Sequence, residues 1–138
     1  MPGRLSTTDA NNVLDTRFGK NAALAVPDEY WLGLSLTLPT PTGGNVTEPV
    51  GNGYSRIQVP NTTAVWPAAA NRNKANLVAF TFPQATGDGW GEIRYFVFYD
   101  AATGGTFRAW GELNPVVTIL GGETRSFPIG AIVVLAPV

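Results

Sequence analysis

Short alternating runs of apolar and polar residues, separated by glycine and proline, dominate the chain from residue 29 onward. This pattern predicts strands, because side chains on one face of a strand recur at every second position. The predicted strands are 30–36, 53–59, 75–82, 90–99, 106–113, 116–120, 126–127 and 131–138. Seven or eight short strands with turn signals between them are typical of an antiparallel β-sandwich or jelly roll. No βαβ alternation is present, which disfavours a parallel sheet.

The run 90–99 is the strongest strand signal in the chain. Ile93 and Val97 lie on one face of this strand, and Phe96 and Phe98 make the other face apolar too. A strand that is apolar on both faces belongs inside a sheet or under a partner. The sequence therefore predicts that this strand is covered on both sides.

The N-terminal segment is the only part with a helical pattern. Ser6 is a suitable N-cap, Asp9 follows at the third helical position, and Gly19 can end the helix in a left-handed conformation. The apolar positions that share one helix face are Ala10, Val13, Leu14 and Phe18. We predict a surface helix over 6–18. The chain is then one all-β domain, 1–138, with an N-terminal arm and helix over 1–19 and a β-sandwich over 29–138.

Charge is scarce in this chain. Charged residues make up 14% of the 138 residues, against about 25% in ordinary soluble domains. Either the surface is rich in uncharged polar residues, or a partner covers much of it. The nine lysines and arginines are scattered and the net charge is −1. No basic cluster can neutralise several phosphates together, so we expect no nucleic-acid partner.

Two residue types that carry much enzyme chemistry are absent. The chain has no cysteine and no histidine, which excludes disulfides, thiolate and imidazole metal sites, and Ser–His or Cys–His catalysis. We expect no metal and no cofactor. The N-terminus does not resemble a signal peptide, and no apolar run approaches the ~20 residues that span a bilayer. We therefore expect synthesis in a cytoplasm and no membrane partner.

Carboxylates are the remaining candidates for acid–base chemistry. The four that flank the predicted central hairpin are Asp88, Glu92, Asp100 and Glu112. Two carboxylates about 5–9 Å apart can serve a glycosidase. The alternative is structural: Glu92 and Glu112 on strand surfaces, paired with Arg94 or Arg108, and Asp100 capping the hairpin loop through its own backbone. The glycine-rich stretches lack the lysine and following helix of a phosphate loop and indicate turns.

Four tryptophans are candidates for packing or recognition. Trp31, Trp90 and Trp110 fall on predicted strands, where core packing is the commoner outcome, although exposed aromatics can stack on sugar rings. Trp66 lies in the loop 61–73, where it can cover one end of the fold or anchor a partner. The candidate partner contacts are Arg4 and Leu5 in the N-terminal segment and Trp66 and Arg72 in that loop.

Seven stretches are distinctive in their order and spacing: Tyr30–Ser35, Gly43–Pro49, Gly51–Arg56, Asn61–Ala69, Phe82–Thr86, Trp90–Ile93 and Phe98–Gly105. Together they resemble a family of small virion proteins of tailed bacteriophages that are often labelled tail fibre proteins. The likeness covers nearly the whole chain, from the Leu-Ser-Thr-Thr opening to the C-terminal strand. It implies a structural role in the virion and no enzymatic activity.

The position on the particle is a separate question. A fibre that spans distance usually shows repeats or heptads, and this chain has neither. We therefore expect a capsid decoration or cement protein that binds the coat lattice, as a homo-oligomer for which a trimer is one candidate. The alternative is a tail or tail-fibre module that recognises a host surface glycan, with tail proteins as partners. A lytic enzyme using Asp100 and Glu112 is the third hypothesis. Synthesis would take place in the bacterial host cytoplasm.

Overall fold

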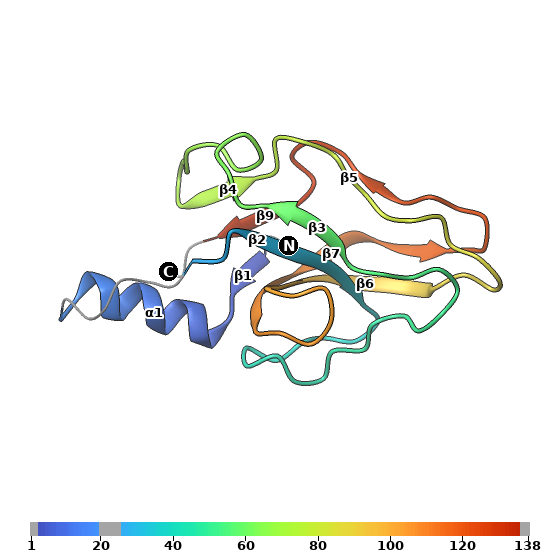
Figure 1. Ribbon diagram of the computed structural model, residues 1–138, viewed down its shortest axis with the longest axis horizontal. Helices are drawn as coiled ribbons and strands as arrows, with labels where there is room; N and C mark the ends of the chain where they lie inside the picture. Colours follow the sequence, from blue (N-terminus) through green and yellow to red (C-terminus); the bar gives the residue numbers. More distant parts are fainter. Residues whose placement is uncertain (1–2, 20–25, 136–138) are drawn as a thin grey trace.

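The computed structural model describes residues 3–19 and 26–135, and it contains one helix and nine strands in those ranges (Figure 1). The elements are β1 (Gly3–Leu5), α1 (Thr7–Arg17), β2 (Glu29–Ser35), β3 (Ile57–Pro60), β4 (Asn73–Ala75), β5 (Phe80–Thr81), β6 (Gly91–Tyr99), β7 (Phe107–Ile119), β8 (Ser126–Phe127) and β9 (Val133–Leu135). The predicted class, all-β with one short N-terminal helix, is confirmed.

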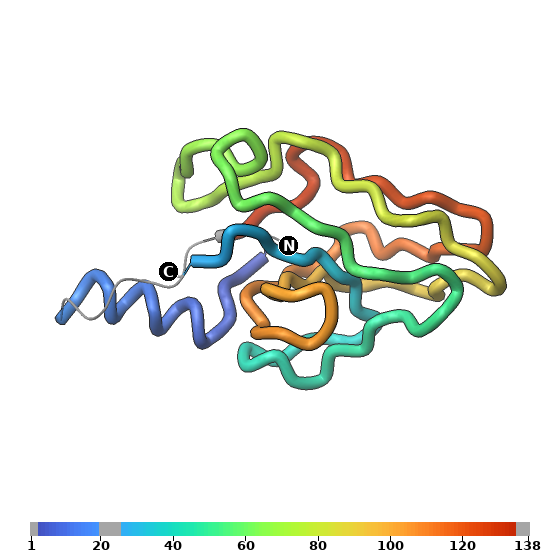
Figure 2. The backbone as a smooth tube through the Cα atoms, viewed as in Figure 1, coloured from blue at the N-terminus to red at the C-terminus, as the bar shows by residue number. Residues whose placement is uncertain are grey.

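Local signals set the bounds of α1. The Ser6 hydroxyl accepts a hydrogen bond from the Asp9 backbone N–H, as the capping pattern predicts, and the helix runs over Thr7–Arg17. Phe18 is the C-cap, and Gly19 follows with φ +95°. The helix projects from one end of the sheet (Figures 1 and 2). None of its residues is buried, so the predicted surface position is confirmed.

Seven strands form one curled, mixed sheet in the order β3-β2-β6-β7-β1-β9-β4, and β5 and β8 form a separate antiparallel pair. β1 pairs antiparallel with β7 and parallel with β9. The sheet curls so that its edge strands β3 and β4 lie on the same side of the molecule (Figure 2). The sandwich or jelly-roll detail is not confirmed, because hydrogen bonding joins seven strands in one sheet.

Four of the predicted strands differ from the observed ones. The predicted strand 53–59 is shortened to β3. The reason is that the Tyr54 hydroxyl accepts a hydrogen bond from the backbone N–H of Leu34 at 2.9 Å, so Tyr54 is not part of the strand. Strand 75–82 is divided into β4 and β5. The cause is the buried Asn76, whose side chain donates to Val78 O and accepts from Ile132 N in place of ladder hydrogen bonds. The two predicted strands 106–113 and 116–120 form one continuous strand, β7, which contains a cis Asn114–Pro115 peptide bond.

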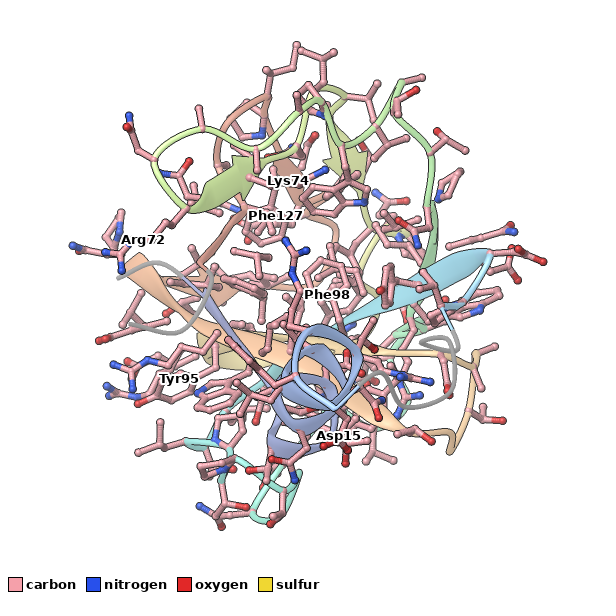
Figure 3. The ribbon with its side chains drawn as sticks, turned by 90° about the vertical axis from the view of Figure 1, so that its left-hand side faces the viewer. Asp15, Arg72, Lys74, Tyr95, Phe98 and Phe127 are labelled. Atoms are coloured by element: carbon pink, nitrogen blue, oxygen red, sulfur yellow. The ribbon has the colours of Figure 1, made fainter. Side chains whose placement is uncertain are left out.

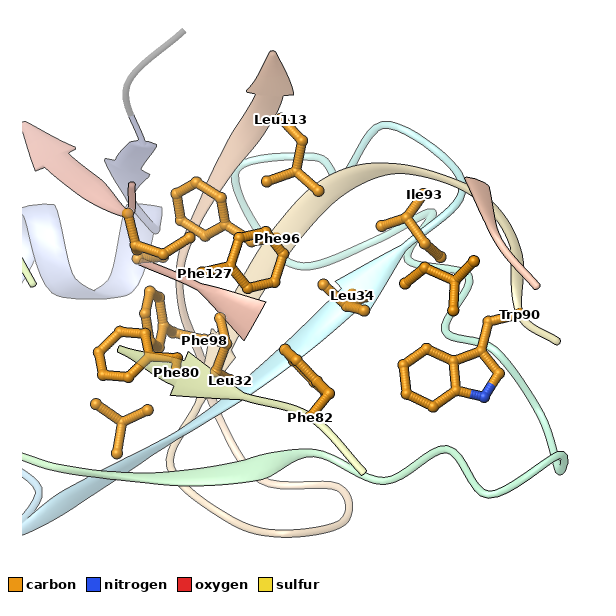
Figure 4. Close-up of a cluster of buried hydrophobic side chains, with 14 of the residues drawn as sticks. Leu32, Leu34, Phe80, Phe82, Trp90, Ile93, Phe96, Phe98, Leu113 and Phe127 are labelled. Carbon is orange, nitrogen blue, oxygen red and sulfur yellow. The ribbon is translucent and has the colours of Figure 1, made fainter. Parts of the chain in front are cut away.

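The core lies between the curled sheet and the β5–β8 pair (Figure 4). Side chains of β2, β6 and β7 pack with Phe80 and Phe127 from the small sheet and with Phe82, which follows β5. Phe82 and Phe127 meet edge to face, with ring centroids 6.0 Å apart. β6 lies between β2 and β7, and Phe96, Val97 and Phe98 are all buried. The prediction that this strand is covered on both faces is confirmed.

Candidate partner-binding end

A cavity of about 400 Å³ opens beside the root of α1, at the end of the curled sheet where the helix projects. We call it the end cavity. Residues of β1, β2, β4, β6, β7 and β9 line it, together with Asp9 of α1 and the loop between β3 and β4. Its volume is within the ~300–1,000 Å³ of ordinary ligand pockets. The curl of the sheet thus produces a concave surface from residues far apart in sequence.

The end cavity has an apolar interior and a cationic rim. The apolar lining is Leu5, Tyr30, Trp66, Phe98, Ala109 and Val134, all buried or half-buried. The exposed side chains of Arg72 and Lys74 add two positive charges. Seen from the helix end, Phe98 lies near the middle, Lys74 above it, Arg72 to one side and Asp15 below on α1 (Figure 3). Such a lining suits an occupant that is apolar with a negative or hydrogen-bond-accepting part.

Arg108 fastens α1 to the sheet at the edge of this cavity. Its guanidinium lies 2.6 Å from Asp9 of the helix and 3.0 Å from Asp100 of the β6–β7 loop. Backbone hydrogen bonds from Ser6 N–H to Arg108 O and from Thr7 N–H to Pro41 O hold the same turn. Burial acts to lower the pKa of Arg108, but the two carboxylates outweigh it and the pKa is raised. The first helical turn is therefore fixed and charged.

Two N–H groups of cavity residues are buried without an acceptor. Within residues 3–19 and 26–135, neither the Trp66 indole Nε1 nor the Arg108 Nε has a hydrogen-bond partner. More than about 90% of buried polar groups in proteins are paired, and an unpaired one costs about 1–3 kcal/mol. Both donors are closed to solvent in this chain, so each is a local energetic cost rather than a contact point for an occupant.

Arg72 is held at the rim by an unfavourable turn. Ala70 and Asn73 exchange backbone hydrogen bonds of 3.0 and 3.1 Å, and both residues between them, Asn71 and Arg72, have positive φ. Glycine is preferred at the second of these positions, since a left-handed conformation costs other residues roughly 1–2 kcal/mol. The turn therefore presents a guanidinium beside the cavity at an energetic cost.

Three of the four predicted partner contacts meet at this cavity. Leu5, Trp66 and Arg72 line it, although they come from β1 and from two ends of a loop. Arg4 is exposed and is not among the lining residues, since neighbouring side chains in a strand point to opposite faces. Whether these residues contact a partner stays a prediction.

The four tryptophans differ in how deeply they are buried. Trp90 is buried, and its indole N–H donates to Asn52 O at 2.8 Å, as expected for a core residue. Trp31, Trp66 and Trp110 are half-buried. Trp66 contacts Phe80 and Phe98 at ring-centroid distances of 5.8 and 5.9 Å, so it joins the core to the cavity wall.

Asp100 and Glu112, the pair of the enzyme hypothesis, do not have the spacing of a glycosidase pair. Glu112 on β7 pairs with Tyr95 on β6. Tyr95 in turn comes five residues before Asp100. At about 3.3 Å per strand residue, Asp100 and Glu112 are separated by roughly 16 Å, beyond the ~5–9.5 Å that hydrolysis uses. The Asp100 carboxylate accepts from Thr106 N–H at 2.7 Å, which confirms its predicted capping role. Arg108 pairs with Asp9 and Asp100 rather than with Glu112, and Glu92 pairs with Arg94.

A second charged cluster lies on the outer face of β2 and β6. Glu48 accepts hydrogen bonds from the Tyr54 hydroxyl at 2.7 Å and from Arg56 at 2.8 and 3.0 Å. Arg56 also donates to Ala101 O and Gly104 O, and its guanidinium lies 3.7 Å from the centroid of the Tyr99 ring. Burial and the neighbouring Glu48 raise the pKa of Tyr54. This cluster joins the β2–β3 loop to the β6–β7 loop, and no sequence signal predicted it.

The interactions of Asp100 predict an acid-dependent contribution to stability. Burial acts to raise the pKa of Asp100, but the hydrogen bonds from Thr106 and Arg108 outweigh it, and the pKa lies below its ordinary value. The stabilisation is therefore complete above the unfolded pKa of about 3.9 and is lost as the pH falls through the folded pKa. We expect Asp100→Asn to lower the free energy of unfolding at neutral pH, with a difference from wild type that shrinks below pH about 4.

Urea unfolding at several pH values measures this difference. Asp88→Asn, at an exposed turn position, is the matched control. A difference between Asp100→Asn and wild type that stays constant from neutral to acid pH would contradict the assignment.

Neither a metal site nor a membrane-spanning helix is found in the described part of the chain. It contains no group of three or more side chains from aspartate, glutamate, histidine and cysteine that could hold a metal ion. No helix there is long and apolar enough to cross a bilayer.

The fold and its end cavity define a small β-structural module with one projecting helix. A family model described as "Podophage GP4 fiber I protein gp80" matches residues 4–135, and the chain belongs to this family. It is a bacteriophage structural protein of fibre type, a component of the virion, and the predicted family is confirmed. No curated protein shows significant similarity to the chain.

Proposed function

We propose that this chain is a non-enzymatic assembly module of a phage fibre, and that it joins other virion proteins through α1 and the end cavity, together called the helix end. The observation that carries the proposal is the exposure of the helix. Leu14 is 57% exposed and Phe18 is 77% exposed, beside a cavity with an apolar lining. Apolar surface of this kind marks interaction sites. The absence of an enzymatic role is also part of the proposal, and the separation of Asp100 from Glu112 supports it.

The alternative to a location in the fibre is the location on the coat lattice that is expected from the sequence. The description of the family as a fibre protein supports the fibre, whereas the lack of repeats and the low charge favour a decoration protein. Cryo-electron microscopy of the parent particle decides between them. Copies along a fibre or tail are the expected result, and copies distributed over the head lattice would overturn the fibre position.

Incorporation into particles tests the helix end itself. We expect Phe18→Asp to reduce the number of copies per virion about 10-fold or more, because a charge at a buried contact opposes association. Leu120→Asp is the matched control, since Leu120 is 56% exposed and follows β7 at the opposite end of the sheet (Figure 1). Quantitative immunoblots of purified particles give the copy number. Equal incorporation of both variants would contradict the proposal.

A further inference from the structure

The exposed end of α1 lacks the support that a helix of this kind needs. It has 11 residues, of which only a few are strong helix formers. Isolated helices shorter than about 12–15 residues are marginal in water, and those in proteins depend on burying an apolar face. Leu14 and Phe18 are four residues apart and form such a face, but they are exposed. Within the part of the chain that the structure describes, the helix therefore lacks a packing partner on this face.

This face cannot pack into the cavity of its own molecule. Contacts to Arg108 and Pro41 hold the first turn at the edge of the cavity. From there the helix runs away from the sheet, so that its second half lies beyond the body of the molecule (Figure 1). Among residues 3–19 and 26–135 none covers Leu14 and Phe18, which leaves this face open to a second molecule.

The end cavity offers what the last turn of α1 lacks. Its apolar lining matches Leu14 and Phe18. The last turn of a helix has C=O groups without intrahelical partners and carries about −0.5 charge, and Asp15 adds a carboxylate. These acceptors match the exposed cations Arg72 and Lys74 at the rim of the cavity. Arg17 lies on the other flank of the apolar face, away from Asp15.

We propose that the end of α1 from one copy of this chain occupies the end cavity of a second copy. Leu14 and Phe18 contact the apolar lining, and Asp15 and the last carbonyls of the helix face Arg72 and Lys74. Each copy then gives one helix and receives one, so the contact is heterologous and closes into a ring when the rotation allows. This inference rests on the proposed function in one respect, that the helix end is the assembly surface.

The oligomeric state of the purified chain is the first test. We expect a concentration-dependent oligomer in light scattering coupled to size-exclusion chromatography. Phe18→Asp should raise its dissociation constant about 30-fold or more, the effect of losing one central anchor, while Leu120→Asp leaves it unchanged. Thermal unfolding confirms that both variants fold.

Two further variants test the cavity side. Ala69 is exposed and lines the cavity, so Ala69→Trp should fill it and abolish the oligomer. A mixture of Phe18→Asp and Ala69→Trp chains should form a one-to-one dimer, because the first keeps its cavity and the second keeps its helix. Asp15→Lys and Lys74→Glu should each weaken association, and the two changes in one chain should restore it.

The outcomes separate this inference from the proposed function. A wild-type chain that is monomeric at every concentration, or an oligomer that Ala69→Trp leaves intact, overturns the second copy as occupant. If Phe18→Asp is nevertheless lost from particles, the helix end binds a different virion protein and the proposed function stands. Oligomers that survive Ala69→Trp but not Phe18→Asp indicate helix-to-helix pairing instead.

Discussion

Phe96→Ala is expected to lower the free energy of unfolding by about 3–5 kcal/mol, the range for removing a fully buried aromatic ring. Phe96 is 2% exposed and meets Phe98 edge to face, with ring centroids 5.8 Å apart. Urea unfolding of the isolated protein measures the change. Leu120→Ala, at an exposed position, should stay within about 0.5 kcal/mol. A loss below about 1 kcal/mol for Phe96→Ala would mean that the ring is not core.

Two glycines explain why the Phe96 site has little freedom to adjust. A Cβ atom at Gly111 would lie 2.3 Å from the ring, and one at Gly3 would lie 2.7 Å from it. Gly111→Ala alone is therefore expected to cost about 1–3 kcal/mol through overpacking. In the Phe96→Ala background the same change should cost less, because the ring that it opposes is gone. A double-mutant cycle measures this coupling, and strictly additive losses would contradict it.

Arg56→Met is expected to have an effect of similar size, about 3–5 kcal/mol, because breaking a buried ion pair leaves the partner charge uncompensated. The Arg56 side chain is 8% exposed and Glu48 is 22% exposed. Methionine keeps much of the volume but makes none of the hydrogen bonds. Glu48 then loses its cation, and the carbonyls of Ala101 and Gly104 lose their donor.

The exposed pair Arg94–Glu92 is the matched control for this variant. Both side chains are about half exposed, at 52% and 50%, and exposed ion pairs contribute only about 0–1 kcal/mol. Arg94→Met should therefore change the free energy of unfolding by less than about 1 kcal/mol. Equal losses for Arg56→Met and Arg94→Met in urea unfolding would contradict a structural role for the Glu48–Arg56 cluster.

Predictions based on local signals agree well with the structure. Ser6, Asp9 and Gly19 located α1 to within one residue at each end, because capping depends on neighbours in sequence. The doubly apolar pattern of 90–99 located β6. Where long-range contacts compete, the pattern fails. Asn76 interrupts a run that alternates well, because Pro128 O and Ile132 N bond its side chain from more than 50 residues away.

The candidate site shows the same division. Trp66 and Arg72 stood out because their loop has few other large side chains, and both line the end cavity. The cavity itself follows from the curl of the sheet, which no local pattern encodes. Arg108 joins Asp9 across 99 residues of sequence, and the Glu48–Arg56 cluster depends on how the β2–β3 and β6–β7 loops meet. Such pairs were beyond prediction from one sequence.

The place of β1 in the sheet also bears on how the chain is made. Gly3–Leu5 leaves the ribosome first, yet its partners are β7 and β9, and β9 is synthesised more than 120 residues later. Because distant pairings form slowly and need both partners, β2, β3 and β6 can pair during translation while β1 waits. The end cavity needs both Leu5 and Val134. A nascent chain therefore lacks a finished end cavity until β9 has been synthesised.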